Sequence, residues 1–258
     1  MIDSHCHLNF IDHSGTPKEL VDEATSVGVH TIVNIGTDLQ SSTESLSLAK
    51  EFGSVYATVG VHPHDARKVN DTEYEKMRAM ADEKKVVAIG EIGLDYYRDL
   101  SPRKIQRQVF QRFLQMAVET KLPVVIHTRE AFEDTVAIVK EFAPDLRGGV
   151  FHSFPGDMTD AAEVLDLGFL IAVNGIITFK NSRMSELARV VPLEKIVLET
   201  DAPYLTPVPF RGKTNRPALV KHVYEKMAEL KNMSFKEIEK TIDRTCQKLF
   251  SLVETLGE

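Results

Sequence analysis

The sequence predicts a protein of the α/β class that folds as a single TIM (β/α)8 barrel, with residues 1–258 forming one domain. Eight short apolar runs rich in β-branched residues recur along the chain, and helical patterns separate them. Dividing the 258 residues by eight gives about 32 residues per repeat, enough for a strand, a crossover helix and two short loops. Eight such units favour closure into a barrel, and an open doubly wound sheet is the alternative.

The candidate strands are mostly continuous apolar runs rather than alternating ones. Continuous apolar strands are typical of a parallel sheet that is covered by helices. The runs are Ile2–His7, His30–Ile35, Val55–Gly60, Val86–Gly90, Pro123–His127, Gly149–His152, Phe169–Val173 and Lys195–Glu199.

Helix signals lie between these runs. Capping boxes at Thr16–Glu19 and Ser234–Glu237 predict two helix starts, the second opening a terminal helix whose apolar stripe extends to Val253. Ser101-Pro102 predicts a third start. An apolar stripe over 132–142 predicts a further helix. The proline-rich segment from Pro203 to Pro217 is expected to be a long, shaped loop after the last strand.

Composition excludes several classes of protein. A hydrophobic content of 43% supports a large core, which excludes disorder of the whole chain. No apolar run approaches the roughly 20 residues that a membrane span requires, and the N-terminus has no basic or apolar leader. Two cysteines do not make a disulfide framework. We therefore expect a cytoplasmic monomer with no membrane contact and no obligate protein partner.

The net charge of −7 argues against non-specific binding to duplex nucleic acid. It does not exclude a polyanionic substrate, because bound cations or a local basic loop can supply the attraction.

Metal-binding side chains gather at the ends of five candidate strands, and those ends meet at one mouth of a barrel. In the His5-Cys6-His7 motif the two imidazoles face the same side of the strand. Histidine and carboxylate ligands suit zinc, manganese or magnesium. The candidate ligands are His5, His7, Glu91, His127, His152 and Asp201.

Two of these residues are also candidate catalytic groups. Glu91 follows an apolar strand, where a carboxylate needs a partner; it either bridges two cations or pairs with a buried Arg or Lys. Asp201 is either a turn aspartate before Ala202-Pro203 or a metal ligand and general base. Glu199 lies one layer deeper on the same face and is expected to form a structural ion pair.

Seven motifs, taken together, resemble the TatD family of metal-dependent deoxyribonucleases, which belongs to the amidohydrolase-like barrels. They occur in order from residue 2 to the terminal helix, so the resemblance covers essentially the whole chain. The motifs are His5–His7, Gly60–His64, Gly90–Tyr96, Val125–Arg129, Phe151–Phe154, Leu198–Tyr204 and Phe210–Pro217.

The resemblance implies two divalent metal ions per chain. His5, His7 and Asp201 would hold one ion, His127 and His152 the other, and Glu91 would bridge them. It also implies phosphodiester hydrolysis, as an exonuclease acting on single-stranded DNA or RNA from the 3′ end.

Further residues of these motifs are candidate substrate contacts. Basic side chains over the mouth are expected to bind phosphate, although Arg129 could instead form a salt bridge with Glu130 or in the neighbourhood of Glu91. Tyrosines are expected to stack on bases, with Tyr97 as ordinary core. The candidates are His62, His64, Arg129, Tyr204, Arg211 and Lys213, with Tyr96 as a second stacking residue.

Two other functions are compatible with the same motifs. The first is an amidohydrolase-type hydrolase of a small ester, lactone or amide. A glutamate at position 91, where related enzymes use a modified lysine, and the basic residues Arg129, Arg211 and Lys213 favour a phosphate substrate instead. The second is a metal-containing scaffold without catalysis, which the complete ligand set and Asp201 disfavour.

Overall fold

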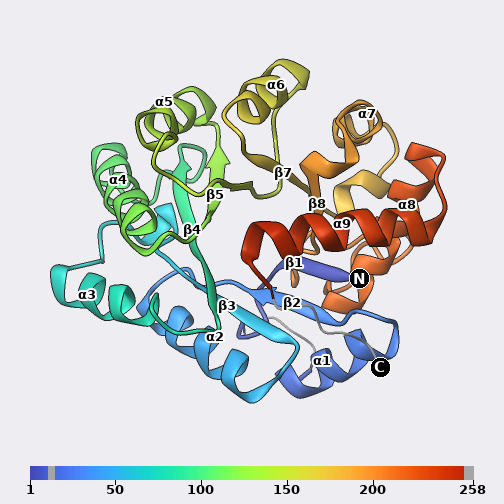
Figure 1. The fold of residues 1–258 in the computed structure, drawn as a ribbon, viewed down its shortest axis with the longest axis horizontal. Helices are drawn as coiled ribbons and strands as arrows, with labels where there is room; N and C mark the ends of the chain where they lie inside the picture. The colour runs from blue at the N-terminus through green and yellow to red at the C-terminus, as the bar shows by residue number, and fades with distance from the viewer. Residues whose placement is uncertain (11–14, 253–258) are drawn as a thin grey trace.

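The computed structural model describes residues 1–10 and 15–252. One eight-stranded parallel sheet contains the strands in chain order, β1 to β8, and helices surround it (Figure 1). The predicted TIM barrel is confirmed. The strands are β1 Ile2–Cys6, β2 Thr31–Asn34, β3 Val55–Val59, β4 Val86–Asp95, β5 Val124–Arg129, β6 Gly149–Phe151, β7 Leu170–Val173 and β8 Ile196–Leu198.

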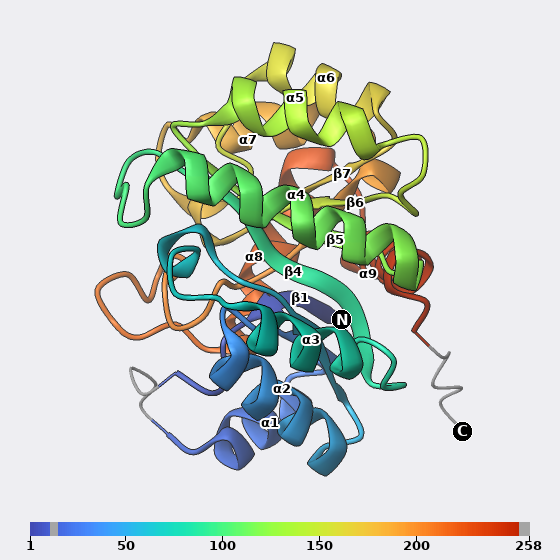
Figure 2. The same ribbon diagram turned by 90° about the vertical axis from the view of Figure 1, so that its left-hand side faces the viewer.

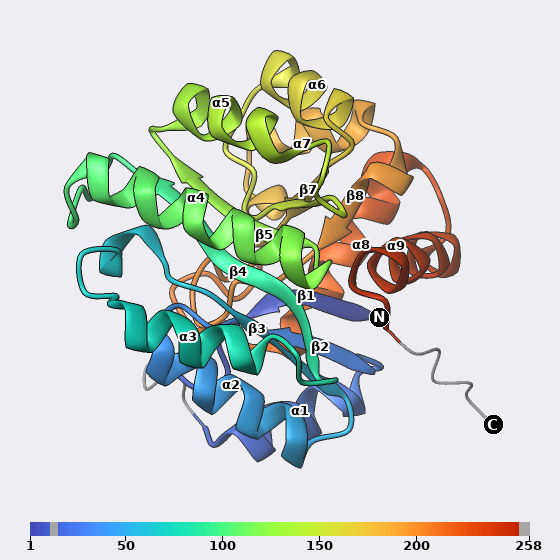
Figure 3. The same ribbon diagram turned by 60° about the vertical axis from the view of Figure 1, so that its left-hand side comes forward.

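The helices form the outer layer, and neighbours in sequence lie side by side around the sheet (Figures 2 and 3). In Figure 2 the segments that follow β3, β4 and β8 project to one side, away from the N-terminus, and mark the mouth of the barrel. The helices are α1 Pro17–Ser26, α2 Leu39–Glu51, α3 Asp71–Met80, α4 Arg103–Thr120, α5 Phe132–Phe142, α6 Met158–Asp166, α7 Arg183–Val190, α8 Val220–Lys231 and α9 Phe235–Phe250.

The helix signals found in the sequence are borne out with one adjustment. Thr16 and Ser234 cap α1 and α9 through complete capping boxes. Helix α4 begins at Arg103 without a side-chain cap, because its N-cap residue is Pro102 rather than Ser101. The Ser101 hydroxyl donates to the backbone oxygen of His64. Val253, expected on the terminal stripe, lies outside the described residues.

Strand β4 is five residues longer than predicted and reaches Asp95. Its second half pairs with β5 through Gly93 opposite His127 and Asp95 opposite Arg129. Gly93 has φ +143°, and a Cβ there would lie 1.9 Å from the carbonyl oxygen of His127, so only glycine fits this approach. As a consequence Glu91 lies in the middle of β4 rather than after its end.

The barrel closes between β1 and the segment that follows β8. The backbone N–H of Asp201 donates to His5 O, and that of His7 donates to Ala202 O, both at 2.9 Å. These two bonds place Asp201 directly beside the histidines of β1. The β8-to-α8 segment then runs through the expected shaped loop and ends in a short 3-10 helix, Pro217–Leu219.

Apolar side chains of the strands and of the inner helix faces form one continuous buried cluster. Among the described residues, no helix combines the length and apolar character that crossing a membrane requires.

Candidate metal centre

The β1 histidines form one side of the centre. His5 and His7 are both buried, and their Nε2 atoms are 3.2 Å apart. Cys6, between them, is fully buried on the other side of the strand, as the period of two requires. If neither Nε2 carries a proton, both lone pairs point at the same space, and two imidazole nitrogens at this distance suit a shared cation.

Glu91 lies at the middle of the cluster, with 3% of its surface exposed. Its carboxylate oxygens are 2.8 Å from His127 Nδ1, 3.5 Å from His5 Nε2, 3.7 Å from His62 Nε2 and 4.0 Å from His152 Nε2. No Lys or Arg is paired with it among the described residues, so its partners are histidines only.

Asp201 closes the centre opposite Glu91. Its Oδ1 lies 3.6 Å from His5 Nε2, 3.5 Å from His7 Nε2 and 3.8 Å from His152 Nε2. Its backbone has φ +55°, in the left-handed region, which aspartate tolerates better than most residues. This conformation accompanies the turn of the carboxylate toward the β1 histidines.

Ligand atoms gather in three overlapping groups in which all atoms lie within 4.8 Å of one another. Two groups share His5 and two share Glu91, so the centre extends from Asp201 on one side to His127 on the other. The grouping also brings in His62, for which the sequence indicated substrate contact. The groups are His5, His152 and Asp201; His5, His7 and Glu91; and His62, Glu91 and His127.

The electrostatics of the centre favour bound positive charge. Burial opposes ionisation of Glu91, but His152, His62 and hydrogen bonds from His127 hold its pKa well below the usual value. Burial opposes ionisation of Asp201 too, and His152 and His7 still lower its pKa. Both carboxylates are therefore charged, and a cluster of buried carboxylates and imidazoles fits divalent cations.

The pKa of His152 also reflects the negative charge of the neighbouring carboxylates. Burial disfavours its protonation, yet Glu199, Asp201 and Glu91 outweigh that effect and raise its pKa to about 10. Its Nδ1 lies 3.0 Å from Glu199 Oε1, and the same oxygen accepts the Ser153 N–H. Glu199 thus lies at ion-pair distance from His152, as the sequence predicted.

Asp95 contacts two histidines of the centre and was not among the candidate site residues of the sequence analysis. It is fully buried at the end of β4, and its Oδ2 lies 2.9 Å from His64 Nε2 and 3.2 Å from His127 Nε2. Burial opposes its ionisation, but the bonds from His127 and His64 lower its pKa. The available signal was its spacing: positions 91 and 95 share one face of an extended strand.

His62 and His64 belong to the centre through different atoms. His62 Nε2 faces Glu91, and its Nδ1 accepts the backbone N–H of His64. Burial and the neighbouring His127 keep the pKa of His62 well below its usual value, so the ring is neutral. Because its Nδ1 accepts from the backbone, its single proton lies on Nε2, toward Glu91. His64 instead contacts Asp95.

Arg129 and the tyrosines after β4 line the β4–β5 side of the mouth. The Arg129 guanidinium lies 3.9 Å from the ring centroid of Tyr97 rather than on Glu130. Tyr97 is 54% exposed, so its assignment to the core was wrong: the chain turns outward after β4. Tyr96 is partly covered and donates to Asp134, with Arg103 over its ring.

The remaining candidates lie on the β8 side. Tyr204 is 46% exposed, and its ring centroid is 6.4 Å from that of Phe10. Arg211 lies 4.1 Å from the Phe179 ring centroid and Lys213 5.6 Å from that of Phe210. The mouth is therefore bordered by cation–aromatic pairs on two sides.

Comparison with known proteins agrees with this geometry. A family model described as TatD related DNase matches residues 2–251. YabD of Bacillus subtilis, an uncharacterised metal-dependent hydrolase, is 38% identical over 253 residues, covering 98% of this chain and 99% of its own. The 3′-5′ ssDNA/RNA exonuclease TatD of Klebsiella pneumoniae is 32% identical, with 98% of each chain covered. The crystal structure of the TatD homologue YjjV from Escherichia coli K12 has a TM-score of 0.91 at 31% identity, covering 98% of both chains.

Fold and relatives together define a barrel enzyme of the metal-dependent hydrolase class, acting on ester bonds. Within that class, the chain belongs to the TatD family.

Proposed function

We propose that the protein is a two-metal phosphodiesterase that removes nucleotides from the 3′ ends of single-stranded DNA or RNA. The observation that carries the proposal is the pair of ligand groups that share Glu91, one with His5 and His7 and the other with His62 and His127. A carboxylate common to two groups is suited to bridge two cations.

His5, His7 and Asp201 would hold one ion, and His127 with His152 the other, with Glu91 common to both. In the structure His152 groups instead with His5 and Asp201, and His62 groups with Glu91 and His127. His62 is therefore an alternative ligand for the second ion. When bound, Mg²⁺, Mn²⁺ or Zn²⁺ would offset charge on a phosphate and lower the pKa of a water. Asp201 remains ionised at neutral pH and is placed to accept the proton of that water.

The surroundings of the centre support a phosphate substrate. Arg129, Arg211 and Lys213 border the mouth and stack on aromatic rings, which leaves guanidinium and ammonium N–H groups able to donate to phosphate oxygens. Tyr204 offers an exposed ring for a base. His64, held by Asp95, lies beside the second ligand group and is a further candidate contact.

The direction of digestion and the substrate are proposed from the names of the relatives. The Klebsiella relative is named a 3′-5′ single-stranded DNA and RNA exonuclease, and a site at the barrel mouth is compatible with a chain end. We propose that the enzyme acts as a monomer. We also propose a cytoplasmic setting, in keeping with its two buried free cysteines.

The test is digestion of a single-stranded DNA oligomer and its RNA counterpart, labelled at the 5′ end, with Mg²⁺, Mn²⁺ or Zn²⁺. Stepwise shortening that EDTA stops, and that a 3′-terminal phosphorothioate blocks, is expected. Asp201→Asn and Glu91→Ala should lose it, while Asp82→Asn, on the surface at the far end of β4, should retain it. A folded, metal-loaded wild type that leaves every oligomer intact but hydrolyses a small lactone or ester would refute the proposal.

A further inference from the structure

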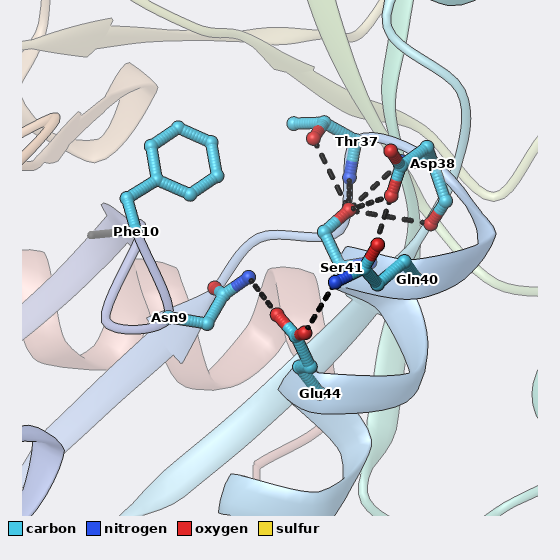
Figure 4. Close-up of a pocket in the computed structure, with 7 residues that line it drawn as sticks. All are labelled: Asn9, Phe10, Thr37, Asp38, Gln40, Ser41 and Glu44. Atoms are coloured by element: carbon cyan, nitrogen blue, oxygen red, sulfur yellow. Dashed lines mark hydrogen bonds between the residues drawn. The ribbon is translucent and has the colours of Figure 1, made fainter.

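A pocket of about 320 Å³ opens beside the metal centre, between the end of β1 and the start of α2. Figure 4 shows Phe10 on one side of it and Thr37 and Ser41 on the other, with the Glu44 carboxylate between Asn9 and Gln40. The position is tied to the centre, because the Phe10 ring stacks on the ligand candidate His7 with centroids 4.3 Å apart and planes 17° apart.

The chemistry of the pocket excludes phosphate and favours a base. None of its lining residues is basic, and two of them, Asp38 and Glu44, are acidic. A phosphate would meet uncompensated negative charge there. Phe10 supplies a flat aromatic face, which is the feature that single-stranded nucleic acid sites use to hold successive bases.

Hydrogen bonds among the polar side chains of the pocket determine which donor and acceptor atoms remain available to a ligand. Asn34 Nδ2 donates to Asn9 Oδ1 at 3.2 Å, and Asn9 Nδ2 donates to a Glu44 oxygen at 3.1 Å. Gln40 Nε2 donates to the other Glu44 oxygen at 2.9 Å. Each carboxylate oxygen accepts one of these bonds and retains a further acceptor position.

Asp38 is engaged differently, since its Oδ1 accepts both the backbone N–H and the hydroxyl of Ser41, each at 2.7 Å. In Glu44, by contrast, side-chain amides position both carboxylate oxygens, and we take Glu44 as the group that meets an incoming ligand. Because a carboxylate accepts and cannot donate, it selects a base edge that carries N–H donors.

We propose that this pocket binds the terminal nucleoside of the substrate, with its base stacked on Phe10 and its N–H edge on Glu44. Guanine fits best because N1–H and N2–H₂ are adjacent donors. Thymine fits worst, since its single N–H is flanked by two carbonyl oxygens that would face the carboxylate. In this arrangement the last phosphodiester of the nucleic-acid strand lies at the metal centre, and this orientation of the strand rests on the proposed function.

The first experiment measures cleavage of oligomers that differ only in the 3′-terminal nucleotide: guanine, thymine or an abasic sugar. The wild type should cleave the guanine end with the lowest KM and the abasic end with a KM about 5- to 100-fold higher. Glu44→Gln should lower the guanine-to-thymine ratio of kcat/KM, and Phe10→Leu should lower the ratio of either base to the abasic end. Ratios within one variant cancel any general damage to the metal centre.

The matched control is Glu51→Gln, an exposed carboxylate of the same helix, which should keep the wild-type ratios. Equal KM values for all three ends in the wild type would overturn the inference while leaving the exonuclease intact.

The second experiment needs no activity. Saturation-transfer NMR with metal-free protein should show binding of 2′-deoxyguanosine that exceeds that of thymidine and is lost in Phe10→Leu. If the wild type bound nucleosides in this way but cleaved no phosphodiester, the nucleoside-pocket assignment would be supported and the proposed function would be refuted. Equal signals for the two nucleosides, unchanged in both variants, would overturn the pocket assignment.

Discussion

Replacing Asp95 with asparagine removes a charge that lies beside His127, a candidate ligand of the proposed second cation. Asp95 is fully buried, its Oδ1 accepts the Arg98 N–H at 2.8 Å, and its Oδ2 faces His127 Nε2. In the structure both ring nitrogens of His127 face carboxylates, Nδ1 facing Glu91 at 2.8 Å and Nε2 facing Asp95. When a cation displaces the proton from Nδ1, Asp95 would hold the remaining proton on Nε2, so that the Nδ1 lone pair is directed at the cation.

The Asp95→Asn variant keeps the bond from Arg98 but turns an amide N–H₂ toward His127. A neutral imidazole then accepts at Nε2 and carries its proton on Nδ1, where it blocks the ion. Loss of such an orienting partner typically costs about 10- to 100-fold in metal affinity, or about 1.4–2.7 kcal/mol. His127 should also lose part of its raised pKa, since Asp95 and Glu91 offset the lowering by burial.

The assay is a titration of metal-free protein with Mn²⁺ by calorimetry, together with oligomer cleavage at low and saturating metal. We expect one of two binding events to weaken and cleavage to recover substantially at high Mn²⁺. Asp82→Asn, an exposed carboxylate paired with Arg78, is the matched control and should bind like the wild type. Two unaltered binding events in a folded Asp95→Asn variant would refute the tautomer argument.

Three further changes have defined outcomes. Chelating the metal should lower Tm, and adding metal back should raise Tm as its concentration increases. At a metal concentration 100 times Kd, the expected gain in the free energy of unfolding is about 2.7 kcal/mol. A Tm that does not change with metal would contradict a buried cation site. Asp3→Asn should leave the free energy of unfolding nearly unchanged at pH 4 and increase it by about 1 kcal/mol or more at pH 9. The sign follows because burial raises the pKa of Asp3 from 3.8 to about 8, so ionisation costs stability as pH rises through that interval; an unchanged pH profile measured by urea unfolding would count against it. Arg129→Ala should raise KM for single-stranded DNA several-fold and reduce the slope of log KM against log salt by about 0.7, the value for one phosphate contact on a single strand. An unaltered slope would remove Arg129 from the phosphate contacts.

The barrel was predictable because each of its eight strands is covered by helices, and a strand that is buried in this way appears in the sequence as a short continuous apolar run. The clustering of the candidate ligands was predictable for a related reason: side chains at the carboxyl ends of parallel strands lie close together at one end of the barrel. His5, His7 and Asp201 needed only the strand order and the period of two to be placed together.

Other features depend on contacts between distant segments and leave little local signal. The extra length of β4 follows from its pairing with β5 through Gly93, and that pairing is what carries Asp95 under His127. Tyr97 resembles a core residue in sequence, yet the turn after β4 exposes it. Glu44 lies on a helix with no motif, and only the fold brings it to Asn9 and Phe10.

The central claim is that Glu91 joins two cations. The most direct measurement is a crystal structure of the Mn²⁺-loaded protein with anomalous diffraction recorded at the manganese absorption edge. The two-metal proposal predicts two anomalous peaks, about 4 Å apart, one beside His5, His7 and Asp201, the other beside His127, with a Glu91 oxygen on each. A single fully occupied peak, or two peaks without Glu91 between them, would contradict the two-metal account.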